Sequence, residues 1–135
     1  MKIESSVLER LTNLVSRGPD IEKCGVLWSL DCEAVQEYSL HPVEGERRSF
    51  SFDMNWWLAE LYRARENGWR FAGYFHSHPS GEELFPSAAD QIGHPPDSKI
   101  LLLGKNGETP RAFLLEGSGK AVRELNLIVM DKQQL

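Results

Sequence analysis

The chain reads FAGYFHSHPSGEELFPSAAD from Phe71 to Asp90. An apolar, aromatic-rich run ends in two histidines, His76 and His78, and Asp90 follows twelve positions after the second of them. Two imidazoles and one carboxylate are a usual ligand set for a catalytic zinc ion, which keeps its fourth position for water. This stretch therefore predicts a strand and a following helix that together carry a metal site.

The residues around the two histidines predict a strand that presents both rings on one face. Arg70 to His76 is mostly apolar, and Asn67-Gly68 precedes it as a turn signal. Because alternate residues of a strand point to the same face, His76 and His78 project together. Pro79 ends the strand, since proline cannot donate to a ladder.

Ser87 predicts the start of a short helix. A serine followed three residues later by an acid resembles a capping box, which places Asp90 in the first turn, where it can face the strand end. The histidine pair and the Ser87–Asp90 pair can each also be explained without a metal. His-x-His often occurs by chance, and Ser87 with Asp90 can be a helix cap and nothing more. The combination, with Pro79 fixing the exit from the strand, favours a metal site.

The order His-Ser-His-Pro, a short loop and Pro-Ser-x-x-Asp resembles the signature of the JAMM metalloproteases, also called the MPN-type or JAB-type family. Glu22-Lys23-Cys24-Gly25 before an apolar strand is similar to the upstream glutamate segment of small bacterial members. Eight residues separate His78 from Ser87, one more than the commoner family spacing. The residues alone favour a solvated carboxylate at a sheet edge for Glu22, and the family resemblance reverses that preference.

The resemblance implies a fold and a set of roles. The fold is α+β: a mixed, mostly antiparallel sheet flanked by two main helices, with a short helix at the metal site, as in JAMM/MPN and cytidine-deaminase-like domains. His76, His78 and Asp90 would hold Zn²⁺. Glu22 would act as general base and then general acid, and Ser87 would stabilise the oxyanion.

The function implied is hydrolysis of a peptide or isopeptide bond after the C-terminal glycine of a ubiquitin-like or sulfur carrier protein. Two alternatives stay open. One is a non-catalytic MPN-type interaction module, although members of that kind typically lack ligand residues. The other is a peptidase for a different substrate, such as a phage-tail component. The oligomeric state and the identity of the carrier are not encoded in any recognisable pattern.

Length and composition fit a single domain over residues 1–135. The chain has 41% hydrophobic and 26% charged residues, ordinary values for a globular protein. A net charge of -5 argues against a nucleic-acid partner bound through a broad basic surface. No signal peptide and no apolar run long enough to span a membrane are visible, so we expect a cytoplasmic protein.

Periodicity and turn residues predict the remaining elements. A Ser6–Glu9 capping box is expected to start the first helix, and Asp53 is expected to cap the second. His41 and His94 are expected to bind no metal, and His94 is expected in an exposed loop. Cys24 is expected in the core. The helices are expected over 5–17 and from 53 to about 67, the latter with Trp56, Trp57, Leu58, Leu61, Tyr62 and Ala64 as an apolar face, and the strands over 22–30, 34–40, 49–52, 70–76, 99–103, 111–115 and 121–129.

Overall fold

The computed structural model describes residues 1–17, 21–31, 33–42, 52–117 and 121–131. Six strands form one sheet in the order β3-β2-β4-β5-β6-β7, and β1 pairs with β8 in a separate two-stranded sheet. Within the large sheet only β4 and β5 run parallel, so the predicted mixed, mostly antiparallel α+β fold is confirmed. The elements are β1 (Lys2–Glu4), α1 (Ser5–Ser16), β2 (Cys24–Ser29), β3 (Glu37–Leu40), α2 (Met54–Glu66), β4 (Arg70–His78), α3 (Ala88–Gly93), β5 (Ser98–Gly104), β6 (Arg111–Glu116), β7 (Ala121–Leu125) and β8 (Ile128–Met130).

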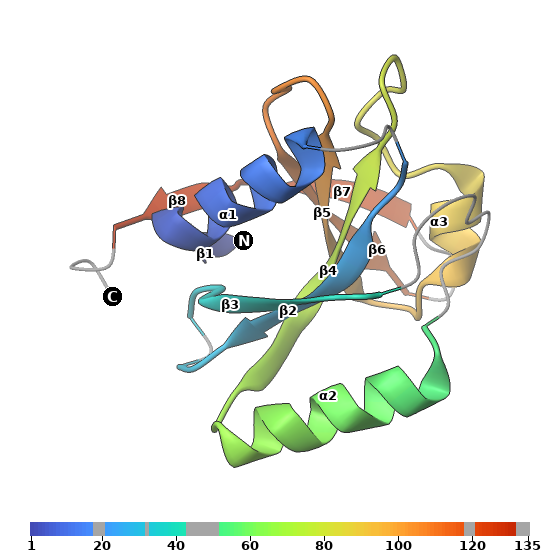
Figure 1. Cartoon of the computed structure of the whole chain (residues 1–135). Coiled ribbons are helices and arrows are strands. Elements are labelled where there is room, and N and C mark those ends of the chain that lie inside the picture. Colours follow the sequence, from blue (N-terminus) through green and yellow to red (C-terminus); the bar gives the residue numbers. More distant parts are fainter. Residues whose placement is uncertain (18–20, 32, 43–51, 118–120, 132–135) are drawn as a thin grey trace.

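The two long helices cover opposite faces of the sheet (Figure 1). Strand β2 shows why: every residue in it is buried, and its side chains alternate between two cores. Leu27 lies in the cluster that includes Val7 and Leu11 of α1. Val26 and Trp28 lie in the cluster on the α2 side. A strand buried on both faces belongs in the middle of a three-layer arrangement.

Gly25 marks a close approach of β2 to its neighbours. A Cβ at this position would lie 2.0 Å from the carbonyl oxygen of Ser39 and 2.6 Å from the ring of Phe75. No side chain fits there without moving the backbone of β3 or a fully buried aromatic ring. This is the physical reason for a glycine directly before the apolar part of β2.

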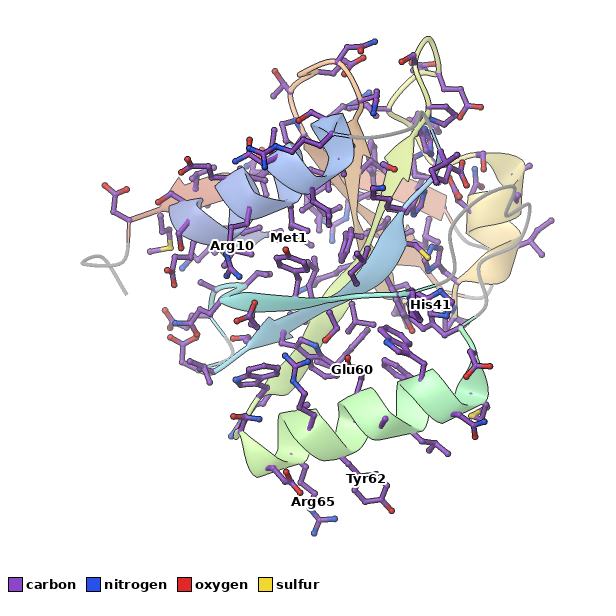
Figure 2. The ribbon with its side chains drawn as sticks, in the orientation of Figure 1. Met1, Arg10, His41, Glu60, Tyr62 and Arg65 are labelled. Atoms are coloured by element: carbon purple, nitrogen blue, oxygen red, sulfur yellow. The ribbon has the colours of Figure 1, made fainter. Side chains whose placement is uncertain are left out.

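Helix α2 begins as predicted but buries less of its apolar face than predicted. The Asp53 side chain accepts a hydrogen bond from the backbone N–H of Trp56 at 3.0 Å, which caps the helix. Ala64 is buried, whereas Leu58 is 46% exposed and Tyr62 67% exposed. Figure 2 shows Tyr62 pointing away from the sheet, while Glu60 points toward it. Only one side of this helix therefore contributes to the core.

Several predicted boundaries are wrong. The predicted last strand is two strands, β7 and β8, because the chain leaves the large sheet at residues 126–127 and β8 pairs with β1 instead. Helix α1 begins after Glu4 without a side-chain cap on the backbone, so the predicted Ser6 capping box is absent. The Ser6 hydroxyl instead donates to the Glu4 carboxylate at 2.7 Å. The strand predicted over 49–52 falls almost entirely outside the described residues, and Phe52 itself is not in a strand.

Candidate metal centre

Three side chains converge at the end of β4. The Nε2 atoms of His76 and His78 lie 3.3 Å apart. His76 Nε2 lies 3.1 Å from Asp90 Oδ1, and His78 Nε2 lies 3.2 Å from Asp90 Oδ2. Both histidines are only 3% exposed. The structure therefore brings together the three residues predicted as metal ligands.

The spacing of these three donor atoms fits a metal ion. In a tetrahedral zinc site with bonds of about 2.0–2.1 Å, two ligand atoms lie about 3.3–3.4 Å apart. The observed separations of 3.1, 3.2 and 3.3 Å are close to the edges of such a tetrahedron. Among the described residues, this is the one group of three histidine, cysteine or acidic side chains close enough to hold an ion together.

His78 is oriented by a backbone carbonyl of the following loop. Its Nδ1 atom lies 2.8 Å from the carbonyl oxygen of Glu83. A carbonyl can only accept, so the proton of a neutral His78 ring sits on Nδ1 and the lone pair on Nε2. In this neutral form the Nε2 lone pair faces Asp90 and His76, whereas a charged His78 ring donates from Nε2 to Asp90. A ligand histidine that donates its other N–H to a carbonyl is typical of metal sites.

Asp90 is held by the predicted capping box of α3. The Ser87 hydroxyl accepts from the Asp90 backbone N–H at 3.1 Å, and the Ser87 backbone N–H donates to Asp90 Oδ2 at 2.8 Å. The loop of eight residues thus returns Asp90 to the histidines in spite of its extra length. Because the Ser87 hydroxyl oxygen acts as an acceptor inside the cap, its proton is directed elsewhere and is available for donation.

The three side chains perturb one another electrostatically. Burial acts to raise the pKa of Asp90, but hydrogen bonds from His76 and His78 outweigh it and hold that pKa far below its usual range. Burial acts to lower the pKa of His78, but hydrogen bonds to Asp90 and to the Glu83 carbonyl outweigh it and raise that pKa. The carboxylate is therefore ionised throughout the physiological range, as a metal ligand must be.

Glu22 belongs to the same neighbourhood. Cys24, the first residue of β2, is the register partner of His76, and Lys23 is hydrogen-bonded to Ser77, so Glu22 precedes β2 on the side of His78. Burial raises the pKa of the Glu22 carboxyl, while the two histidines act in the opposite direction and Asp90 adds to the rise. Glu22 thus interacts electrostatically with all three ligand candidates but is not part of their group.

His94 is a residue that sequence reasoning placed wrongly. It was predicted in an exposed loop, yet it is 1% exposed. Its ring stacks on His76 with centroids 5.9 Å apart and an interplanar angle of 13°, and it also contacts Tyr74. Pro95-Pro96 is a sound loop signal, but a loop backbone does not decide where its side chains lie. Burial here comes from packing against β4.

His41 has a structural role. It is fully buried, and its Nε2 accepts a hydrogen bond from the Asp53 backbone N–H at 3.1 Å. Its ring packs against Phe52 and Trp56 at the start of α2. Cys24 is buried as predicted.

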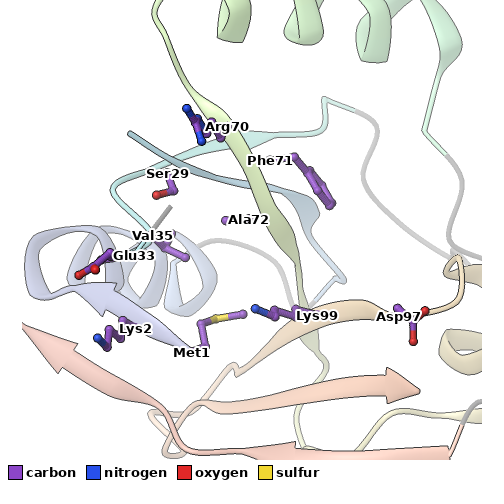
Figure 3. A pocket seen from close by; sticks show the side chains of 11 residues that line it. Met1, Lys2, Ser29, Glu33, Val35, Arg70, Phe71, Ala72, Asp97 and Lys99 are labelled. Atoms are coloured by element: carbon purple, nitrogen blue, oxygen red, sulfur yellow. The ribbon is translucent and has the colours of Figure 1, made fainter. Parts of the chain in front are cut away.

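A separate cavity lies at the other end of β4 (Figure 3). It has a volume of about 300 Å³, and Arg70 and Phe71, the first residues of β4, line it together with Lys99 and Met1. His76 and His78 end the same strand and do not reach it. The cavity is therefore distinct from the candidate metal centre.

None of the helices in the described ranges is long and apolar enough to cross a membrane.

Comparisons with known proteins identify a family and a fold. The family described as prokaryotic homologs of the JAB domain matches residues 4–115. A solution structure of a Desulfitobacterium hafniense protein is 23% identical, with a TM-score of 0.80 over 98% of this chain and 94% of that one. A crystal structure of a JAB1/MPN domain protein from Archaeoglobus fulgidus is 15% identical, with a TM-score of 0.62 over 95% of this chain and 99% of that one.

A third structure, described as a metalloprotease-like zinc site in the proteasome and signalosome, is 16% identical, with a TM-score of 0.61 over 97% of this chain and 98% of that one. No curated protein matches the sequence significantly. At these identities the structural likenesses establish the fold.

Proposed function

Because the chain belongs to the family of prokaryotic homologs of the JAB domain, we propose that it is a zinc-dependent peptidase of the JAMM type. The observation that carries the proposal is the triangle of donor atoms from His76, His78 and Asp90, with edges of 3.1–3.3 Å, beside the acidic side chain of Glu22. One of the similar structures is described as holding a metalloprotease-like zinc site, which supports the proposal.

The mechanism divides between the ion and the protein. A zinc ion held by the three ligands would supply a Lewis acid and lower the pKa of a bound water from about 16 to near 7. Glu22 accepts a proton from the attacking water on its carboxylate and passes it to the leaving nitrogen. Its raised pKa suits this exchange, because a general base works best when its pKa is near the working pH.

Ser87 is proposed as the oxyanion donor. Its hydroxyl oxygen already accepts from the Asp90 N–H, which fixes the oxygen at the start of α3 and leaves the hydroxyl proton to donate. One preorganised donor of this kind is typically worth a factor of about 10²–10³ in rate. Glu82 and Glu83 are weaker candidates for the base, because Glu82 is 56% exposed in the loop and the Glu83 contact to His78 is made by its backbone.

The proposed substrate is the extended C-terminal tail of a ubiquitin-like or sulfur carrier protein, cut after its terminal glycine. Such a tail can bind by adding a strand to a sheet edge. Strand β3 is one edge of the large sheet and pairs directly with β2, the strand that follows Glu22. A tail bound along this edge would bring the scissile bond toward the metal centre.

The test is a cleavage assay on a carrier protein extended beyond its terminal Gly-Gly, with protein of measured zinc content. We expect one zinc per chain and a single cut after the glycine, detected by mass spectrometry. Zinc-loaded protein that binds the carrier but leaves it intact would contradict the peptidase assignment and favour an interaction module. A carrier that is neither bound nor cut, with other peptides hydrolysed, would contradict the substrate alone.

A further inference from the structure

The loop between the two halves of the metal centre is also a structural support for it. The Glu83 carbonyl in this loop, 2.8 Å from His78 Nδ1, sets the tautomer and the direction of that ring. The placement of one backbone carbonyl therefore affects the ligand geometry. The Phe85 backbone N–H also donates to this carbonyl, at 2.9 Å.

Arg111 of β6 contacts the adjacent peptide. Its Nη1 donates to the carbonyl oxygen of Leu84 at 2.9 Å. Its Nε and Nη2 donate to the two carboxylate oxygens of Glu124 on β7, at 2.9 and 2.8 Å. A guanidinium is planar, so a bidentate pair with Glu124 fixes the direction of the third donor. The Leu84 carbonyl is thereby tied to two strands of the sheet.

Side-chain packing also holds this part of the loop in place. Leu84 is 7% exposed and lies in the cluster that contains Phe113. The ring of Phe85 meets the Phe113 ring edge-on at 5.4 Å, and the Arg111 guanidinium lies 5.0 Å from that ring on β6. The loop is thus anchored directly after Glu83.

We propose that Arg111, held by Glu124, is a positioning residue for the metal centre: by fixing the Leu84 carbonyl it keeps the neighbouring Glu83 carbonyl on His78 Nδ1. The inference rests on the proposed metal site for its consequence, but the hydrogen-bond chain from Glu124 to His78 can be tested without any metal.

The chain offers a matched control for the test variant Arg111→Met. Arg123 of β7 forms an ion pair with Glu116 of β6, which joins the same two strands without touching the loop. Arg123→Met therefore loses a comparable surface pair and leaves the Leu84 carbonyl contact intact. Glu124→Gln is a milder variant, because it keeps acceptor capacity while removing the charge. Thermal unfolding of each protein checks that the variants are folded.

Two measurements are made on each variant. Long-range ¹H–¹⁵N spectra of the metal-free protein, recorded at alkaline pH where the rings are neutral, report the tautomer of His78. Titration with Co²⁺ alone gives its affinity, and the visible absorption bands report the ligand geometry.

We expect Arg111→Met to lose the pure Nδ1–H form of His78, to bind Co²⁺ about tenfold more weakly and to show altered bands. Arg123→Met should match the wild type, and Glu124→Gln should change in the same direction as Arg111→Met but less. A folded Arg111→Met with wild-type tautomer, affinity and bands would overturn the positioning role. If the wild type binds no Co²⁺ but the tautomer still changes in Arg111→Met, the hydrogen-bond chain stands and the proposed metal function fails.

Discussion

Ser77 of β4 and Lys23, the residue before β2, exchange two hydrogen bonds. The Lys23 backbone N–H donates to the Ser77 hydroxyl at 2.9 Å, and the Ser77 backbone N–H donates to the Lys23 carbonyl at 2.8 Å. Ser77 stands between the two histidines, and Lys23 stands next to Glu22. This pair therefore sets the spacing between the proposed base and the proposed ligands.

Removing the Ser77 hydroxyl should lower both stability and turnover. Ser77→Ala leaves the buried Lys23 N–H without its acceptor, which costs about 1–3 kcal/mol in the free energy of unfolding. Ser39→Ala is the control: Ser39 accepts from Trp28 Nε1 at 2.8 Å in an equally buried place away from the metal centre. Denaturant unfolding of both should show similar losses, and only Ser77→Ala should reduce turnover. Equal turnover in the two variants would contradict a positioning role for this pair.

Glu22→Gln should abolish most turnover and keep the metal. Loss of a general acid/base typically costs a factor of about 10²–10⁴ in rate. Zinc content should stay at the wild-type level, because Glu22 is outside the ligand group. Zinc analysis and cleavage rates on the same samples test both statements, and a fully active variant would remove Glu22 from the mechanism.

Glu22 should also make the metal-free protein less stable as the pH rises. Its pKa is raised in the folded protein, mainly by burial, so the unfolded chain loses this proton first. Stability from this group is thus fully present below the unfolded pKa, near 4.5, and is lost as the pH rises toward the folded pKa. We expect Glu22→Gln to be more stable than the wild type at pH 7 and not at pH 3.5. If thermal unfolding shows the wild type to be more stable than Glu22→Gln at pH 7, the predicted direction of this pH dependence is wrong.

The stacking of His94 on His76 predicts different results for two substitutions. His94→Ala opens a cavity behind a ligand ring, and large-to-small changes in a core cost about 2–5 kcal/mol. His94→Phe keeps a flat ring of similar size. Thermal unfolding and Co²⁺ titration should show a loss of stability and affinity for the alanine variant and near wild-type affinity for phenylalanine. Lost affinity in a stable phenylalanine variant would instead make a ring nitrogen of His94 the relevant group.

Sequence reasoning succeeded where a local pattern dictates the structure. A period of two places His76 and His78 on one face, and a serine three residues before an acid makes the cap that holds Asp90. Both patterns act over a few residues. The family resemblance then pointed to Glu22, which no local pattern distinguishes from a solvated carboxylate.

Features that depend on contacts between distant elements were missed. The carbonyl of Glu83 is a backbone group and leaves no mark in the sequence. Arg111 reaches Leu84 across 27 positions, and His94 is buried because β4 lies beside it. Leu58 and Tyr62 were predicted on the apolar face of α2 but are exposed, because that face is wider than the sheet surface available to cover it. Only the tertiary structure decides these points.

The central claim is that His76, His78 and Asp90 hold one zinc ion with Glu22 beside it. Anomalous diffraction at the zinc edge, from crystals of zinc-loaded protein, tests it most directly. The account predicts one strong peak about 2.0–2.2 Å from both histidine nitrogens and an Asp90 oxygen, with the Glu22 carboxylate within one water of the ion. A peak bound by other residues, no peak at all, or a Glu22 carboxylate turned away from the ion would contradict it.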